Sequence, residues 1–253
     1  RLFDHNRYSN DFDNYVMTSP DLAIWSSSTV CPAAAGPTRA RLVFVNGGFP
    51  GPADSDWNSV ARATASHNTL CLAETSSSRL VRHAKLEGIV GGLPIRGPDM
   101  VAARLSDEGG KAVLAGSHDG YLQRFGLMHF RRIELSLNGE VVDGMDRLEP
   151  PQGSLRLKVD LPYAIHFHLH PDCKCQRLPG HEGCRITVND GQVWQFTADG
   201  ADMTIEDGLY FVDSAGPRPA LQIVLRGATF GESEVRWRIA LTPPDTAAET
   251  SKV

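Results

Sequence analysis

Histidines beside short polar residues are the groups in this chain whose types and spacing could carry chemistry. His67 lies in the run Ser66-His67-Asn68, immediately before an apolar segment. Imidazole titrates near pH 6.5 and can exchange protons in the physiological range. The adjacent Asn68 could orient the ring or hydrogen-bond an anionic group of a substrate. The alternative is a buried histidine that hydrogen-bonds backbone carbonyls.

A second group of histidines consists of His166, His168 and His170. Alternate residues of a strand point to one face, so these three imidazoles would lie together. With Asp172 and nearby cysteines they could hold a divalent metal such as zinc. The spacing matches no established zinc signature, and a polar strand face that ends at His170 is the alternative interpretation.

A third group joins the segment 117–121 (Ser-His-Asp-Gly-Tyr) to the segment 129–132 (His-Phe-Arg-Arg). The first segment is typical of a turn. Arg131 and Arg132 would point to opposite faces of a strand, and an inward arginine can bind a carboxylate through two hydrogen bonds. For both segments a structural role is the simpler explanation, with His129 the exception.

Strands must position these groups, because the dominant hydrophobic period of the chain is two. Apolar or alternating runs predict the strands 42–45, 69–72, 133–137, 186–188, 193–196, 221–225 and 235–239. Asn138-Gly139 predicts a hairpin with a two-residue type I′ turn, and one short helix is expected over 54–61. The pattern predicts an all-β fold: a large antiparallel two-sheet β-sandwich over 1–242, followed by a disordered C-terminal tail over 243–253.

Composition argues against several classes of function. The chain has 253 residues, a net charge of −5 and scattered lysines and arginines, which gives no reason to expect nucleic acid as a partner. No apolar run reaches the roughly 18 residues that a membrane span needs. There is no Gly-x-Ser-x-Gly, phosphate-binding loop or dinucleotide fingerprint. The five cysteines are odd in number, so they cannot all pair within the chain.

Taken in order, these motifs resemble the C-terminal β-sheet domain of the heparinase II/III-like polysaccharide lyases. The resemblance rests on the blocks 61–70, 117–121, 125–132, 167–172 and 222–225, and covers nearly all of the chain. It implies a sandwich that follows an N-terminal α-helical toroid, with the substrate cleft between the two. The toroid is absent from this chain, which begins at Arg1 and which we interpret as a fragment or a mature form.

The resemblance implies β-elimination on a uronic-acid-containing polysaccharide. This reaction needs a group that neutralises the carboxylate, a base for the C5 proton and an acid for the leaving oxygen. In the family the sandwich supplies one histidine, which His67 matches, and the toroid supplies the tyrosine and an Asn or His. We therefore expect His67 to be catalytic. The expected substrate-binding residues are Asn68, Arg62 and Arg131, and the chain alone is expected to be inactive.

Some relatives also bind zinc in the sandwich, so the resemblance implies a structural zinc, with His129, His168 and His170 as the expected ligands. No cofactor is expected to be required for catalysis. The implied partners are an acidic polysaccharide, such as a glycosaminoglycan or alginate, and the toroid of the same polypeptide. The implied location is the periplasm or cell envelope. Two rival hypotheses remain: a non-catalytic carbohydrate-binding or scaffold sandwich, and a metal-binding sandwich of cupin type that uses His166, His168 and His170.

Overall fold

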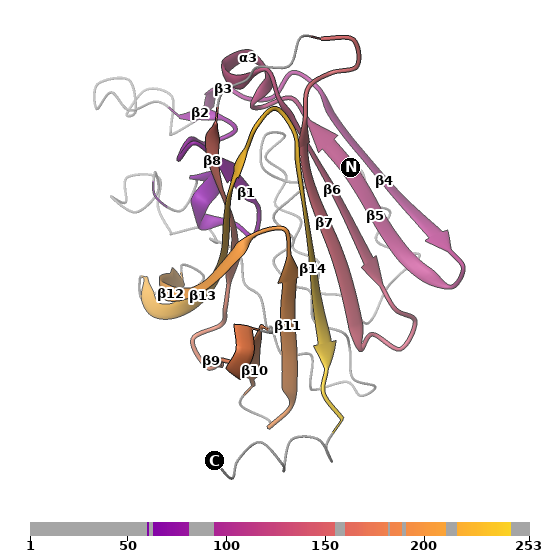
Figure 1. The fold of residues 1–253 in the computed structure, drawn as a ribbon, viewed down its shortest axis with the longest axis vertical. Helices are drawn as coiled ribbons and strands as arrows, with labels where there is room; N and C mark the ends of the chain where they lie inside the picture. The colour runs from indigo at the N-terminus through magenta and orange to yellow at the C-terminus, as the bar shows by residue number, and fades with distance from the viewer. Residues whose placement is uncertain are drawn as a thin grey trace.

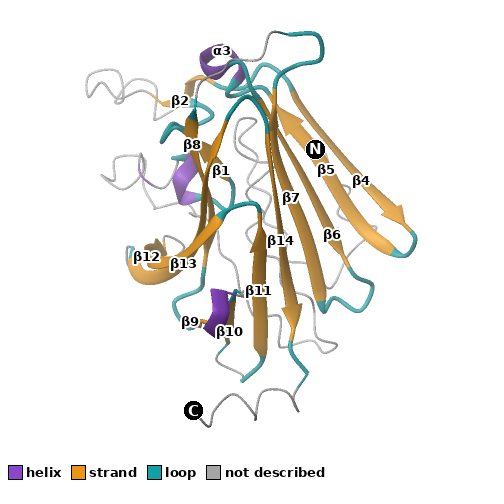
Figure 2. Cartoon of the chain, in the orientation of Figure 1, coloured by secondary structure: helices purple, strands orange, loops and turns teal. Residues whose placement is uncertain are grey.

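The described part of the chain is almost entirely β-structure, arranged as two facing antiparallel sheets (Figures 1 and 2). The structure is a computed structural model, and it describes residues 60, 63–80, 94–154, 160–181, 183–188, 191–210 and 217–243. The all-β, two-sheet antiparallel fold is therefore confirmed.

The larger sheet has eight strands in the order β4-β5-β6-β7-β14-β11-β10-β9. Strands β4 to β7 follow one another as a meander, and β9 to β11 form a second meander. Strand β14, the last described strand of the chain, lies between the two and joins them into one sheet. The strands are β4 (Val101–Glu108), β5 (Lys111–His118), β6 (Met128–Leu135), β7 (Val141–Glu149), β9 (Lys174–Arg177), β10 (Cys184–Thr187), β11 (Val193–Asp199) and β14 (Ser233–Leu241).

The smaller sheet has four strands in the order β1-β8-β13-β12, and a separate two-stranded ladder pairs β2 with β3. None of the helices in the described ranges is long and apolar enough to cross a membrane. The remaining elements are β1 (Leu70–Leu72), β2 (Arg79–Leu80), β3 (Pro94–Arg96), β8 (Leu161–His168), β12 (Asp202–Tyr210), β13 (Arg218–Thr229), η1 (Thr64–Ser66), α3 (Leu122–Phe125) and η2 (Pro179–His181).

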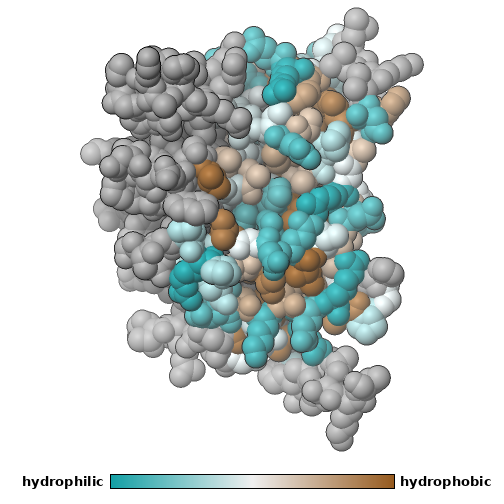
Figure 3. Space-filling view, turned by 90° about the vertical axis from the view of Figure 1, so that its left-hand side faces the viewer, coloured by the Kyte–Doolittle hydropathy of each residue, from teal (hydrophilic) through white to brown (hydrophobic). Residues whose placement is uncertain are grey.

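The core lies between the two sheets and is built from alternate residues of the strands. In β7 every second residue is buried, and in β8 the alternate residues Tyr163, Ile165 and Phe167 are buried. The sheets meet through aromatic rings: the Phe167 ring centroid lies 5.0 Å from those of Phe196 and Trp237 in the facing sheet. Removal of this apolar surface from water stabilises the sandwich. The side of the molecule that carries β12 and β13 shows hydrophilic residues with smaller hydrophobic groups between them (Figure 3).

Gly144 on β7 allows the indole of Trp237 to lie against the sheet. The two residues are directly opposite each other in the β7–β14 ladder. A Cβ atom at position 144 would lie 2.0 Å from Cε2 of Trp237, so any side chain here would displace the ring. The close approach brings the indole N–H within 2.9 Å of the Asp146 carboxylate.

The hairpin predicted at Asn138-Gly139 is confirmed between β6 and β7, but the predicted two-residue type I′ turn is wrong. The Gly139 amide donates to the Ser136 carbonyl at 2.9 Å, so Leu137 and Asn138 are the central residues of the turn. Only Gly139 has a positive φ, of 70°, whereas a type I′ turn needs two such residues. The Ser136 hydroxyl donates to Asn138 Oδ1 at 2.7 Å and supports this longer loop over 136–140.

The other predicted strands overlap observed ones: β1, β6, β10, β11, β13 and β14. The strand predicted over 42–45 lies outside the described residues. The helix predicted over 54–61 also lies outside them, with the exception of Val60. Arg62 and the tail beyond residue 243 lie outside the described residues as well.

Candidate functional site

The segment Ala63–Thr69 leads into β1 and carries the histidine that we expected to be catalytic. Element η1 turns the chain, and the His67 amide donates to the Thr64 carbonyl at 3.1 Å. The Thr64 hydroxyl accepts a hydrogen bond from the Ser77 amide at 3.0 Å. His67 is 6% exposed and Asn68 is 7% exposed. This polar segment is therefore packed into the structure rather than lying over it.

Three hydrogen bonds hold the segment that contains His67 against both sheets. The Arg131 guanidinium, from the large sheet, donates to the Asn68 carbonyl. The Tyr121 hydroxyl donates to the Leu70 carbonyl at 2.8 Å. The Asn68 side-chain oxygen accepts from the amide of His168, on β8, at 2.7 Å. The chain is thus fixed to both sheets immediately after His67.

His168 lies beside this segment, where its ring contacts the backbone of Ala65. Its Nε2 donates to the Ala65 carbonyl at 3.0 Å, which leaves Nδ1 as the acceptor of the neutral ring. Burial lowers the pKa of His168 to about 3, and charges on His166 and His67 lower it further. The rings of His166 and His168 stack with centroids 5.9 Å apart, and His166 Nδ1 lies 3.1 Å from Gln222 Oε1. His168 is therefore neutral at physiological pH.

A second polar cluster, the Asp146 network, lies between the two sheets and consists of Asp146, Arg131, His129, His118 and Trp237. Oδ1 of Asp146 accepts from Arg131 Nε at 2.7 Å and from His129 Nε2 at 2.8 Å. Oδ2 accepts from Arg131 Nη2 and from Trp237 Nε1, each at 2.9 Å. Asp146 is 1% exposed, and four donors satisfy its carboxylate.

The backbone determines the tautomers of the two histidines in the Asp146 network. The Gly120 amide donates to His118 Nδ1 at 3.1 Å, so the proton of the neutral ring is on Nε2. This Nε2–H points to His129 Nδ1 at 3.1 Å and leaves the His129 Nε2–H for Asp146. All four ring nitrogens are used within the protein.

Burial and charge keep the Asp146 network in a single protonation state. Burial lowers the pKa of His118 and of His129, although the Asp146 carboxylate partly opposes the shift of His129. For Asp146, burial alone would raise the pKa. The Arg131 charge and the hydrogen bonds from His129 and Arg131 outweigh burial and hold this pKa well below its ordinary value. The stable state is an ion pair of Asp146 with Arg131, flanked by neutral imidazoles.

The contacts of Arg131 and Asn68 differ from the predicted substrate-binding roles. An arginine that points inward can bind a carboxylate through two hydrogen bonds, and Arg131 does so with Asp146. It also donates to the Asn68 carbonyl, so its guanidinium is committed to internal partners. The side-chain oxygen of Asn68 is likewise bonded to the backbone of β8. Both residues hold the segment that carries His67.

The predicted zinc ligands do not fit a metal site. Over the described residues, no three His, Cys, Asp or Glu side chains are arranged to hold a metal ion. His129 uses both ring nitrogens, and His168 Nε2 is bonded to a carbonyl. His170 lies past the end of β8 with its Nδ1 3.5 Å from the Asp172 carboxylate. The same geometry argues against a cupin-type metal centre at the histidines of β8.

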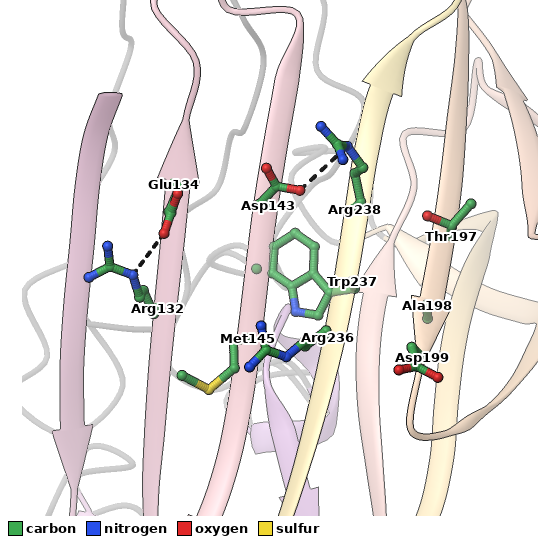
Figure 4. Close-up of a pocket in the computed structure, with 11 residues that line it drawn as sticks. Arg132, Glu134, Asp143, Met145, Thr197, Ala198, Asp199, Arg236, Trp237 and Arg238 are labelled. Carbon is green, nitrogen blue, oxygen red and sulfur yellow. Dashed lines mark hydrogen bonds and ion pairs between the residues drawn. The ribbon is translucent and has the colours of Figure 1, made fainter. Parts of the chain in front are cut away.

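A groove of about 730 Å³ crosses the face of the large sheet that points away from the core (Figure 4). Arg132, Met145 and Arg236 lie in one row across its strands. Arg132 pairs with Glu134 at 2.9 Å, and Arg238 pairs with Asp143 at 3.4 Å. Because these side chains neutralise one another, the groove presents no single charge to a ligand.

Sequence reasoning did not identify Asp146 and Trp237 as partners of the histidine clusters. The motif around Asp146 is most simply interpreted as a turn, yet the residue lies inside β7. One signal was available: Asp146 shares the inward phase of Val142 and Leu148. A carboxylate among apolar core positions requires a buried cationic or hydrogen-bonding partner.

Comparison with known proteins identifies one family and several related structures. Residues 38–238 match the family described as Heparinase II/III-like, C-terminal. The heparan sulfate lyase HepC from Pedobacter heparinus shares the fold with a TM-score of 0.61 and 13% identity, over 80% of this chain and 29% of HepC. A crystal structure of heparinase III shares it with a TM-score of 0.60 and 12% identity, over 90% of this chain and 32% of that protein.

One relative found by sequence is named for its localisation and not for a lyase activity. FtsZ-localized protein C from Caulobacter vibrioides (strain NA1000 / CB15N) is 28% identical over 184 residues, which are 70% of this chain and 31% of the relative. The chain therefore spans about a third of the length of the proteins that it matches.

Proposed function

This chain belongs to the heparinase II/III-like, C-terminal family, and from that premise we propose that it is the β-sandwich part of a polysaccharide lyase. The substrate is a uronic-acid-containing polysaccharide, which is cleaved by β-elimination. In this proposal the sandwich covers the substrate cleft and supplies His67. A toroid domain supplies the remaining catalytic groups.

The observation that supports this proposal is the way in which the segment around His67 is held. Asn68 and Leu70 are bonded through their carbonyls to Arg131 and Tyr121, and the Asn68 side chain is bonded to β8. A group that transfers a proton or binds a carboxylate must be held close to its productive geometry, and such anchoring supplies this. A histidine that served only to fill the core would not need anchors from both sheets.

The neighbouring His168 is suited to assist His67 in binding the substrate. A neutral imidazole does not compete with His67 for a negative charge, and its acceptor nitrogen can take a hydrogen bond from a sugar hydroxyl. His67 would then abstract a proton or contact the uronate carboxylate. In this proposal the sandwich supplies this one group, and the tyrosine and the Asn or His of the toroid complete the elimination.

The test measures polysaccharide binding and elimination separately with the 253-residue chain. We expect the chain to bind alginate or heparan sulfate in calorimetry, without forming the ultraviolet-absorbing unsaturated product. His67→Ala should weaken binding about tenfold, the cost of one hydrogen bond to a charged group. His170→Ala, a histidine past the end of β8, is the matched control and should bind as the unchanged chain does. Failure to bind any uronate polymer, or rapid elimination by this chain alone, would contradict the proposal.

A second candidate function follows from the relative with the higher sequence identity. FtsZ-localized protein C is 28% identical to this chain, whereas the lyase structures are 12–14% identical. Its name refers to localisation at FtsZ and not to a lyase activity. The alternative is therefore a non-catalytic sandwich that recruits or positions a larger protein at FtsZ.

Co-sedimentation with FtsZ polymers tests this second candidate directly. If it holds, the chain pellets with polymerised FtsZ and stays in solution without polymer, and His67→Ala has no effect. Cell fractionation adds a second criterion, since the lyase proposal places the protein in the periplasm or cell envelope. Binding of uronate polymer without binding of FtsZ would favour the lyase proposal.

A further inference from the structure

Cys175 on β9 and Cys184 on β10 lie together at one end of the large sheet. In this antiparallel ladder Cys184 is opposite Arg177 and Cys175 is opposite Ile186, so the two cysteines are diagonal neighbours. Cys184 and Ile186 are fully buried, and Cys175 shares their inward face because it is opposite Ile186. The thiols are close enough for Cys184 to donate a hydrogen bond to Cys175.

The two thiols differ in reactivity. The hydrogen bond from Cys184 lowers the pKa of the Cys175 thiol, and Cys175 is only partly buried. The same hydrogen bond, followed by burial, raises the pKa of the Cys184 thiol. A thiolate is the reactive form of cysteine, so Cys175 is the nucleophile and Cys184 the buried neighbour that can react second.

The other described cysteines lack this arrangement. Cys71 on β1 is buried, its thiol donates to the Thr75 carbonyl at 3.2 Å, and burial raises its pKa to about 11. Cys173 is also buried. Neither is a favourable first nucleophile toward a reagent in solution.

The position of β9 permits the movement that bond formation needs. Diagonal neighbours across a ladder are farther apart than the Cβ separation that a disulfide prefers. Strand β9 has four residues and, among the described strands, is the last of its sheet and pairs with β10 alone. It can therefore shift toward β10 without breaking a second ladder, and a bond formed in this way is readily reversed by excess thiol.

We propose that Cys175 and Cys184 form a reactive dithiol pair that exchanges with low-molecular-weight disulfides and closes into an intrachain disulfide. The Cys175 thiolate attacks one sulfur of the reagent, whose S–S bond breaks and releases one thiol. Cys184 then loses its proton and attacks the Cys175 sulfur, which releases the second thiol. Two electrons and two protons pass from the protein to the reagent, and the new bond ties the edge strand β9 to β10.

Oxidised glutathione, removed before denaturation and analysis, provides the test on the full chain. The expected result is the loss of the two thiols of Cys175 and Cys184, with one peptide that links these two residues. Excess reduced glutathione should restore both thiols. Because peptide mapping is performed on the unchanged chain, the result does not depend on whether a variant folds.

Variants assign the order of the two steps. Cys175→Ser should abolish the loss of thiols, whereas Cys184→Ser should leave Cys175 as a mixed disulfide with glutathione. Cys71→Ala is the matched control and should still form the Cys175–Cys184 bond. A disulfide that joins Cys173 to either residue, or unchanged thiols after long exposure to the reagent, would overturn the proposal.

Discussion

Two polar clusters of this sandwich each contain two imidazoles and an arginine–carboxylate pair but have different environments. The Asp146 network has two imidazoles and the pair Arg131–Asp146, whose side chains are 2% and 0% exposed. A second cluster, on the face of the small sheet directed away from the core, also has two imidazoles, His166 and His168. Its ion pair, Arg226–Glu206, has side chains that are 47% and 33% exposed.

The position of a group relative to the two sheets, and not its residue type, therefore decides whether it is buried in a structural network or accessible to solvent. Between the sheets the side chains are shielded from bulk solvent, and the Asp146 network has a protein partner for each carboxylate oxygen and each ring nitrogen. On the other face Arg226 and Glu206 remain partly in water, and the imidazoles adjoin the segment of His67. The Asp146 network holds the sheets together, whereas the cluster of His166 and His168 lies where a ligand could be bound.

Removal of the Asp146 carboxylate should have the largest effect. Asp146→Ala leaves the Arg131 charge buried and unpaired, and should lower the free energy of unfolding by about 3–5 kcal/mol. Chemical denaturation monitored by circular dichroism measures this quantity. Asp143→Ala, three residues away on the same strand and paired with Arg238 at the exposed groove, is the control. A loss below about 1 kcal/mol for Asp146→Ala would mean that the network does not stabilise the sandwich.

Acidification should destabilise the protein partly through His168. Its folded pKa is about 3, below the ordinary value of 6.5, so the unfolded chain binds the proton first as the pH falls. Stability is therefore complete above roughly pH 6.5 and decreases toward pH 3 by about 1.4 kcal/mol per pH unit from this group. The free energy of unfolding of the His168→Gln variant should fall less steeply with decreasing pH, by that amount per pH unit. Chemical denaturation at a series of pH values measures this slope. His170→Gln, at a partly exposed site, should change the slope less, and equal slopes for all three proteins would contradict the prediction.

The anchor from Tyr121 should have a smaller effect. Tyr121→Phe keeps the buried ring and removes the donor to the Leu70 carbonyl, which should cost about 1–3 kcal/mol because that acceptor is left unsatisfied. Hydrogen exchange of the amides around His67 should rise at the same time. Tyr163→Phe, whose hydroxyl bonds the Gly200 carbonyl outside this segment, is the control and should leave those amides protected.

The exposed ion pair should contribute least. Glu206→Ala removes the partner of Arg226, and because solvent screens this pair the free energy of unfolding should change by about 0–1 kcal/mol. Added salt should reduce even this difference. A loss as large as that of Asp146→Ala would show that the exposed ion pair stabilises the protein as much as the buried one does.

Much of the architecture could be predicted from sequence because it depends on local alternation. The strands β11, β13 and β14 follow from runs with apolar residues at every second position, and the β6–β7 hairpin follows from Asn138-Gly139. The antiparallel two-sheet architecture follows from the same alternation, whereas the order of the strands within each sheet does not. The turn type did not follow, because side-chain contacts of Ser136 within the loop decided it.

The chemistry of the polar clusters depended on contacts between residues far apart in the chain. Period and spacing identified His67, His129 and Arg131 as groups able to do chemistry. Only the tertiary structure decided that Arg131 binds Asp146, that an indole 91 residues beyond Asp146 completes the network, and that a carbonyl 63 residues before Arg131 accepts from it. The physical reason is that alternation specifies which face of a strand is buried, whereas the partner of a buried charge is set by how the two faces meet.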